Sequence, residues 1–379
     1  MRAERKAHDT RAPTVKEVAR LADVSTATVS RVMSGAGGVR KELVRRVHHA
    51  AENLGYQPNP AGRNLRVRST RTIGMVFPDI ENPFYASVIS GAEEVLQSAG
   101  YALLLANYGE DPVRENTQLT TLRAERVAGI LFAASGRPSA DYRSVLDAGI
   151  ALVAVSRIPV GLPVDLATVS NQEGARQATE HLIRLGHRRI GFIDGPVSLS
   201  TTRERHAGYE QAFRAERLAV PRDLTVYAEF FHRDAGFDAV MTLLRVASRP
   251  TALLVVSNNM ALGALEGLRE RGLEVPADMA VVGFGDTPWA ALLQPPLTVV
   301  AQPAREIGAT GARLLLERLQ NPERPRRSIV LDTQLTVRES CGAKLGVGPA
   351  QPVAALRHPV GLAKRIPKPG RHPRARNRT

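Results

Sequence analysis

Short apolar runs alternate with helical patterns from residue 71 to residue 340. The first run, Thr72–Phe77, is followed by a helical pattern from about Phe84 to Ser98, and the same succession recurs along the segment. Almost continuous apolar strands are typical of parallel sheets that helices cover on both faces. The strands are too many for one compact sheet. We therefore predict two lobes with doubly wound parallel sheets and a ligand cleft at the carboxyl ends of the strands.

The same alternation also suits a doubly wound enzyme. However, the sequence contains no G-x-G-x-x-G after the first strand, no P-loop and no G-x-S-x-G nucleophile motif. The nine histidines and the one cysteine, Cys341, show no metal-ligand spacing, and a single cysteine fits a reducing cytoplasm. We therefore expect a protein that binds rather than catalyses, with no cofactor, no metal and no membrane span.

Residues 14–34 predict two short helices joined by a tight turn. Thr14 and Glu17 have capping-box spacing, and Ser25 is placed to cap the second helix. This pattern matches a helix-turn-helix, whose second helix lies in the DNA major groove, although another small helical hairpin is the alternative. In the first case base edges and phosphates would be contacted by Ser25, Thr26, Ala27, Thr28, Ser30 and Arg31.

A third helix is expected from about Arg40 to Leu54, with Gly55 as its C-cap residue. The basic segment 61–68 follows a Pro-containing stretch and is too short to be a stable helix alone, so a solvated linker is its plain interpretation.

The net charge of +14 is unevenly distributed. Residues 1–12, 13–70 and 341–379 carry net charges of +2, +6 and +9, whereas residues 71–340 carry −3. Affinity for a polyanion is therefore expected only at the two ends, where DNA, RNA and a membrane surface are all compatible with the charge. The last segment is rich in Pro, Gly, Arg and Lys, a composition typical of disorder.

The stretches TVKEVARLADVS, TVSRVMSG and LGYQPNPAGRNLR resemble the DNA-binding head and hinge of the lactose-repressor (LacI/GalR) family of bacterial transcription regulators. The resemblance implies a hinge that becomes helical on DNA and inserts Leu65 into a minor-groove base step, a known kinking device. It also implies DNA contacts by Tyr56, Asn59 and Arg63. Asp23 replaces the usual turn glycine, and Gly62 replaces a commoner alanine.

The resemblance continues to about residue 339 through DIENPFYASVISGAEE, EHLIRLGHRRIGFIDGP and MALGALEGLRERGLEVPADMAVVGFGDTPWA. It implies the periplasmic-binding-protein type I fold, with chain crossings near residues 185, 300 and 327. The N-lobe would comprise about 71–185 and 300–326, and the C-lobe about 186–299 and 327–340. The N-lobe usually supplies the dimer contacts in this family.

The effector-binding residues that the resemblance implies are Phe84, Arg205, Phe231, Ser257, Asn258, Asp286 and Gln302. Arg205 would grip a hydroxyl or a carboxylate, with an exposed helix arginine as the alternative. Gly285 stands where the family has an aspartate that accepts from the effector, which suggests an anionic or less hydroxyl-rich ligand.

We therefore expect a cytoplasmic, dimeric repressor that binds a palindromic double-stranded DNA operator and a sugar-like or anionic effector. The alternative is a DNA-binding regulator whose ligand pocket has decayed. The expected domains are a basic N-terminus (1–12), a helix-turn-helix domain (13–58), a hinge (59–70), an effector-binding and dimerisation domain (71–340) and a basic tail (341–379).

Overall fold

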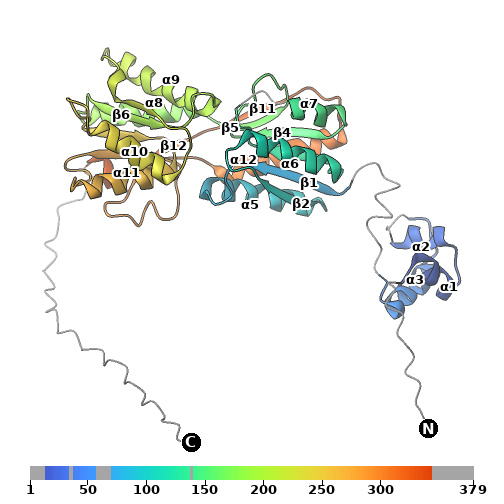
Figure 1. Cartoon of the computed structure of the whole chain (residues 1–379). Coiled ribbons are helices and arrows are strands. Elements are labelled where there is room, and N and C mark those ends of the chain that lie inside the picture. Colours follow the sequence, from blue (N-terminus) through green and yellow to red (C-terminus); the bar gives the residue numbers. More distant parts are fainter. Residues whose placement is uncertain (1–12, 34–36, 57–69, 137–139, 344–379) are drawn as a thin grey trace, which may run out of the picture.

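The computed structural model describes residues 13–33, 37–56, 70–136 and 140–343. These residues form a helical head, which ends at residue 56, and a two-lobed α/β body, which begins at residue 70 (Figure 1). Both had been predicted from the sequence patterns. Within the described residues, no helix is long and apolar enough to cross a membrane.

The head consists of the helices α1 (Val15–Leu21), α2 (Thr26–Met33) and α3 (Lys41–Leu54). Its core is formed by Val18, Val29 and Val47, one from each helix, and none of the three has exposed surface. Apolar residues at helical spacing therefore meet in one small core, as expected of amphipathic helices.

The turn between α1 and α2 explains two features of the sequence. Asp23 has a left-handed backbone with φ of 50°, which aspartate tolerates better than most residues. Its carboxylate is held by Arg46 Nη2 of α3 at 3.1 Å. Ser25 Oγ accepts from the Thr28 N–H at 3.1 Å and so caps α2, as predicted.

The body contains two six-stranded sheets, one in each lobe (Figure 1). The order in the N-lobe sheet is β11-β5-β4-β3-β1-β2, and all its strands are parallel: β1 (Thr72–Phe77), β2 (Ala102–Asn107), β3 (Gly129–Phe132), β4 (Ala151–Val155), β5 (Asp165–Val169) and β11 (Ser328–Leu331).

The order in the C-lobe sheet is β12-β10-β9-β8-β6-β7, in which only β12 is antiparallel: β6 (Ile190–Asp194), β7 (Thr225–Tyr227), β8 (Ala252–Val255), β9 (Ala280–Phe284), β10 (Thr298–Ala301) and β12 (Gln334–Thr336).

Helices cover both faces of each sheet. Those of the N-lobe are α5 (Pro83–Ser98), α6 (Pro112–Ala124), α7 (Ala140–Asp147) and α12 (Ala304–Gln320); those of the C-lobe are α8 (Asn171–Arg184), α9 (Ser200–Ala215), α10 (Arg233–Leu243) and α11 (Asn258–Glu270).

Two of the three expected chain crossings were misplaced. The first follows β5 rather than lying near residue 185, because α8 packs against α9 in the C-lobe. The second, near residue 300, lies between β10 and α12 as expected. The third lies between β11 and β12 rather than near residue 327, because β11 pairs with β5 in the N-lobe sheet. A strand's own sequence does not record which sheet it joins.

Three helix pairs pack backbone against backbone at glycines. A Cβ at Gly308 of α12 would lie 1.8 Å from the Val88 carbonyl oxygen of α5, and one at Gly91 of α5 would lie 1.9 Å from the Arg305 oxygen. Gly208 makes the same close backbone contact between α9 and α8, and Gly236 and Gly263 make it between α10 and α11. These pairs accept no side chain at the crossing.

Candidate functional site

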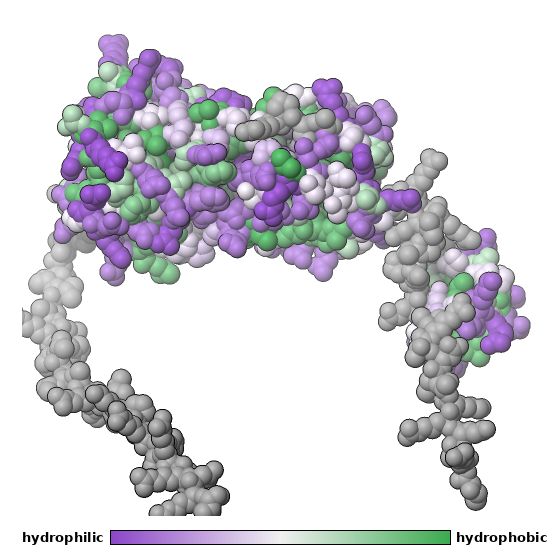
Figure 2. Space-filling model, viewed as in Figure 1, coloured by the Kyte–Doolittle hydropathy of each residue, from purple (hydrophilic) through white to green (hydrophobic). Residues whose placement is uncertain are grey.

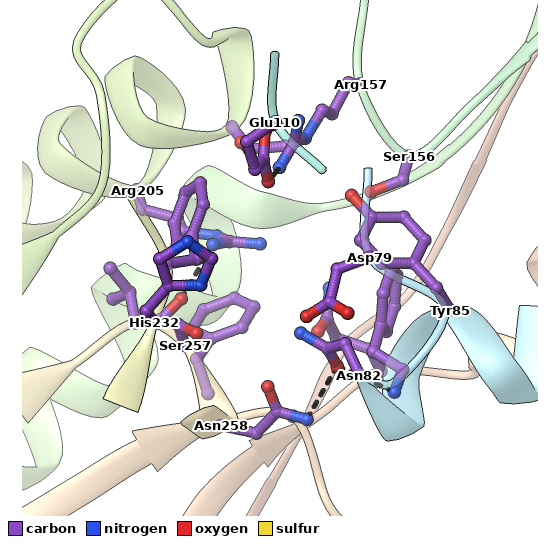
Figure 3. A pocket seen from close by; sticks show the side chains of 17 residues that line it. Asp79, Asn82, Tyr85, Glu110, Ser156, Arg157, Arg205, His232, Ser257 and Asn258 are labelled. Carbon is purple, nitrogen blue, oxygen red and sulfur yellow. Dashed lines mark hydrogen bonds and ion pairs between the residues drawn. The ribbon is translucent and has the colours of Figure 1, made fainter. Parts of the chain in front are cut away.

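A cleft lies between the two lobes at the carboxyl ends of the parallel strands (Figure 3). It encloses about 600 Å³, including the part open to solvent. Its lining comes from the loops after β1, β2 and β4 in the N-lobe and after β7, β8, β9 and β10 in the C-lobe, together with α9. This is the position in which open α/β sheets bind ligands.

Arg157, directly after β4, forms the principal ion pair of the cleft. Its Nη2 lies 2.6 Å from Glu110 Oε1 and its Nη1 lies 2.8 Å from Glu110 Oε2. The guanidinium also lies over the rings of Tyr85 and Phe231, at 5.9 and 5.4 Å from their centroids. Arg157 is 4% exposed, so this bidentate pair supplies the countercharge that a buried guanidinium needs.

Arg205 of α9 has a different environment. Its Nε donates to Asn171 Oδ1 at 3.1 Å and its Nη1 to the Val256 carbonyl oxygen at 2.7 Å. The guanidinium carbon lies 4.4 Å from the centroid of the Phe284 ring. Arg205 is 7% exposed and, among the described residues, forms no ion pair. Figure 3 shows its guanidinium directed into the cleft.

Two asparagines connect the lobes directly. Asn258 Nδ2, at the start of α11, donates to Asn82 Oδ1 at 3.0 Å, and both side chains are buried (Figure 3). The same Asn82 oxygen accepts from the Phe84 N–H at 3.0 Å and caps α5. A second contact between the lobes is the bond from the Ile158 N–H to Ser200 Oγ at 2.9 Å.

Six of the seven residues expected to bind the effector line the cleft: Phe84, Arg205, Phe231, Ser257, Asn258 and Gln302. The seventh, Asp286, does not, and that expectation was wrong. Its carboxylate turns to Arg338, whose Nη2 lies 3.0 and 2.8 Å from its two oxygens. The preceding Gly285 has φ of +93° and does line the cleft, so the loop faces the cleft with backbone rather than with a carboxylate.

The polar and charged residues that the N-lobe contributes to the cleft were not predicted from the sequence. Asp79, Glu110, Ser156 and Arg157 all line the cleft. Glu110 and Ser156 have positive φ angles of 60° and 66°, a strained conformation that clusters at functional sites. A usable signal was present, because Ser156 and Arg157 are polar residues placed directly after the apolar run of a parallel strand.

Asp194, at the end of β6, is a buried carboxyl group behind the cleft. Its Oδ1 accepts from the Gly195 N–H at 2.7 Å, whereas Oδ2 has no partner among the described residues. Burial raises the pKa of Asp194 to about 7, although the positive charge of Arg205 acts in the opposite direction. The carboxyl group is therefore largely protonated in the folded protein at slightly acidic pH.

This raised pKa predicts how Asp194→Asn changes the dependence of stability on pH. From about pH 4 to pH 7 the unfolded chain ionises this residue and the folded chain does not, so its contribution to the free energy of unfolding falls as pH rises, by about 1.4 kcal/mol per unit. Asparagine does not ionise, so the variant does not lose stability in this way as pH rises. The stability of the variant relative to the original chain should rise from pH 5 to pH 7 and then level off in urea titrations.

Asp223→Asn is the matched control, because Asp223 is exposed and its hydrogen bond from Arg189 lowers its pKa. That carboxyl group is ionised above pH 5 in both the folded and the unfolded protein. The difference in free energy of unfolding between this variant and the original chain should therefore stay constant. A constant difference for Asp194→Asn as well would contradict the raised pKa.

The head presents a polar face along the start of α2. Ser25, Thr26, Ala27, Ser30 and Arg31 are exposed, and Thr28 is half-buried. Tyr56 is half-buried and packs against the head core. The other residues expected to contact DNA lie outside the described residues: Asn59, Arg63 and Leu65.

Family models match both parts of the chain. Residues 14–59 match the bacterial regulatory proteins of the lacI family, and residues 179–341 match a periplasmic binding protein-like domain. The ribose operon repressor of Haemophilus influenzae is 35% identical over 328 residues, which cover 86% of this chain and 98% of that protein.

Solved structures agree with the fold. The complex of the transcriptional regulator CelR with cellobiose is 34% identical with a TM-score of 0.67, over 86% of this chain and 99% of that one. The Lac repressor dimer bound to operator and an anti-inducer is 27% identical with a TM-score of 0.77, over 88% of this chain and 100% of that one. The chain belongs to the LacI family of bacterial regulatory proteins.

Proposed function

We propose that this DNA-binding regulator represses transcription as a homodimer on a palindromic operator, and that a small molecule in the interlobe cleft changes its operator affinity. Such coupling is reciprocal, because DNA must change effector affinity by the same factor. The proposal places the protein in the bacterial cytoplasm and assigns it binding rather than catalysis.

The exposed face of α2 is the observation that carries the DNA-binding part. Thr26 and Ala27 lie in its first turn, where a recognition helix meets base edges, and Arg31 lies one turn further on the exposed side. An arginine there can form two hydrogen bonds with a guanine. We propose phosphate contacts for Ser25, Thr28 and Ser30.

The homodimer is supported by an apolar surface at the edge of the N-lobe sheet. Leu104 and Leu105 of β2, the outermost strand, are 39% and 49% exposed. Figure 2 shows hydrophobic residues gathered along the lower edge of the body, where Figure 1 places α5 and β2. A second copy of the chain would cover this surface, and two heads would then read the two halves of a palindrome.

Two features of the cleft argue against the alternative of a decayed pocket. A buried guanidinium faces the cleft, and strained backbone at Glu110 and Ser156 lies in its wall. Both are costly to keep without a ligand. A regulator blind to effectors would show no ligand-dependent change in melting temperature.

Selection of bound sequences from a random DNA pool, at one stated salt concentration, tests this function. We expect a palindrome, and a central pyrimidine–purine step in it would support the minor-groove role predicted for Leu65. A selected site without two-fold symmetry would contradict the dimer. Recovery of no preferred sequence would contradict sequence-specific regulation.

Replacement of two exposed arginines should separate base recognition from phosphate binding. Arg31→Ala should lower affinity for the selected operator by roughly 1–3 kcal/mol and relax base preference at one position in each half-site. Arg45→Ala, on α3, should weaken all DNA alike and reduce the salt slope by about 1. Binding titrations on operator and scrambled DNA at several salt concentrations measure both effects. An equal loss on both DNAs for Arg31→Ala would contradict its role in base recognition.

A further inference from the structure

We propose that the C-lobe binds the phosphate backbone of double-stranded DNA through Arg245, Arg249 and Arg271, at the end of the lobe that lies away from the cleft. This contact would not read sequence and would be additional to the contact made by the head. It goes beyond the proposed function, because it would allow a dimer bound to its operator to hold a second segment of DNA.

The helices α10 and α11 pack against each other in the C-lobe (Figure 1), and a hollow lies where both of them end. It encloses about 1060 Å³, including the part open to solvent. This basic hollow is lined by Met241, Leu244, Arg245, Val246, Ala247, Arg249, Arg271 and Leu273. α11 begins in the cleft at Asn258 and is 13 residues long, so at 1.5 Å per residue its other end is about 20 Å away. The basic hollow is therefore separate from the effector cleft.

The three arginines of the basic hollow are exposed cations without an acidic partner. None of them forms an ion pair within the described residues, and the lining contains no Asp or Glu. Glu270 and Glu274 lie on either side of Arg271 in the chain, but neither lines the basic hollow. Arg271 Nε donates to Met241 Sδ at 3.2 Å, which is a weak and uncharged acceptor. The guanidinium groups therefore remain available to an anion from outside the chain.

The ends of the two helices balance only part of this positive charge. α10 ends at Leu243 and α11 at Glu270, and the last turn of a helix carries roughly half a negative charge, which nearby cations offset. The two helix ends therefore balance about one of the three positive charges and leave about two for a ligand. Phosphate groups suit arginines especially well, because a guanidinium can hold a phosphate through two parallel hydrogen bonds.

The strongly basic end of the chain begins at the same end of the C-lobe. A Cβ at Gly342 would lie 3.7 Å from Pro276 Cβ, and Pro276 belongs to the loop that begins with Arg271. Residues 344–379 lie outside the described residues and contain nine Lys and Arg but no Asp or Glu. Residues 71–340, by contrast, carry a net charge of −3. A polyanion is therefore attracted to this end of an otherwise slightly acidic body.

Duplex DNA is the polyanion that these residues favour. Neither the lining of the basic hollow nor residues 344–379 contain Phe, Tyr or Trp. Single-stranded nucleic acids are usually held by aromatic side chains on which the bases stack, and segments that bind membranes commonly use aromatic residues as well. Arginines alone can contact the phosphates of a duplex without reading its bases. Because the head binds DNA, a dimer on its operator also meets neighbouring duplex at high local concentration.

Capture of a second duplex tests this inference on the full-length protein. Operator DNA on beads would be saturated with protein, excess protein would be washed away, and labelled duplex without an operator would be added at one stated salt concentration. We expect capture of the second duplex. Replacing the three arginines together (Arg245→Gln, Arg249→Gln and Arg271→Gln) should lower the affinity for the second duplex at least about tenfold and reduce the salt slope by about 3. Affinity for a short operator duplex, which the heads bind, should stay the same.

Two further full-length variants locate the effect. Replacing Arg114, Arg123 and Arg143 by Gln removes the same charge from exposed positions on α6 and α7 of the N-lobe and should leave capture unchanged. Replacing all nine Lys and Arg of residues 344–379 by Gln should weaken capture. Replacing the three arginines of the basic hollow in that variant should weaken it further.

The inference would be overturned if the original chain captured no second duplex, if the triple variant of the basic hollow captured as much, or if the N-lobe control lost as much. It would also be overturned if single-stranded RNA or vesicles of phosphatidylglycerol displaced the second duplex more effectively than unlabelled duplex does. Two dimers per captured complex, measured by light scattering, would overturn it as well, because a second pair of heads would then explain the capture. The short operator duplex measures recognition by the heads separately, so the proposed function stands or fails independently.

Discussion

Gly308→Ala should destabilise the protein by at least about 3 kcal/mol and lower its melting temperature by about 6 °C or more. Alanine adds only one carbon, but that carbon would lie 1.8 Å from the Val88 carbonyl oxygen and 3.0 Å from the Ala92 nitrogen. Both contacts are with backbone, which cannot rotate away as a side chain does. The helices α5 and α12 would have to separate, and N-lobe packing would be lost along their length. Urea unfolding followed by circular dichroism measures the change.

Gly267→Ala is the matched control for this prediction. Gly267 also lies in a helix, α11, but its added carbon would meet the flexible end of Met241 at 3.0 Å and the Phe237 ring at 3.4 Å. Because alanine favours helix over glycine by up to about 1 kcal/mol, this variant should be neutral or slightly more stable. Equal stability of the two variants would contradict the prediction that α5 and α12 are too close at Gly308 to accept a side chain.

Asp165→Ala should cost about 3–5 kcal/mol, the range for removing one partner of a buried ion pair. The Asp165 carboxylate is fully buried and accepts from Arg318 Nε at 3.0 Å, from Arg324 Nη2 at 2.9 Å and from the Arg327 N–H at 2.8 Å. It therefore joins the end of α12 and the start of β11 to β5. Without it, the mostly buried Arg318 loses its ion-pair partner, and the mostly buried Arg324 keeps only Glu317 at 3.9 Å.

The same residue predicts acid sensitivity. Burial by itself would raise the pKa of Asp165, but hydrogen bonds from Arg318, Arg327 and Arg324 outweigh it and lower the pKa. A carboxyl group with a lowered folded-state pKa stabilises the fold above its unfolded pKa of about 3.9, and this contribution is lost as pH falls through the folded pKa. The cost of Asp165→Ala, measured by urea unfolding, should therefore shrink below pH 4. A cost that is independent of pH would contradict the ion-pair explanation.

The sequence predicted the elements of this protein better than their assignment to lobes. Apolar periodicity located β1 and α5 to within one residue, because burial on one or both faces leaves a pattern in the local sequence. The lobe of α8 and the sheet of β11 depend on partners far away in the chain. Their own residues suit either lobe, so local pattern carried no information on that choice.

Only some of the residues that line the cleft were predicted from the sequence, for a similar reason. The family resemblance singled out Arg205 and Asn258, which both line the cleft, since each continues a recognisable motif. It misjudged Asp286, whose carboxylate is drawn away by Arg338, a residue 52 positions later in the chain. Glu110 was missed because its role depends on pairing with Arg157, which no spacing between the two reveals.

The amide oxygen of Asn82 takes part in two hydrogen bonds and links the cleft to helix α5. This oxygen both caps α5 and accepts from Asn258 of the opposite lobe, so the start of that helix forms part of the contact between the lobes. Because the α5 and α12 backbones touch at Gly91 and Gly308, the two helices cannot slide along each other. A displacement at the cleft should therefore move α5 and α12 together as one rigid unit. The rate of amide hydrogen exchange should then change in the same direction along both helices.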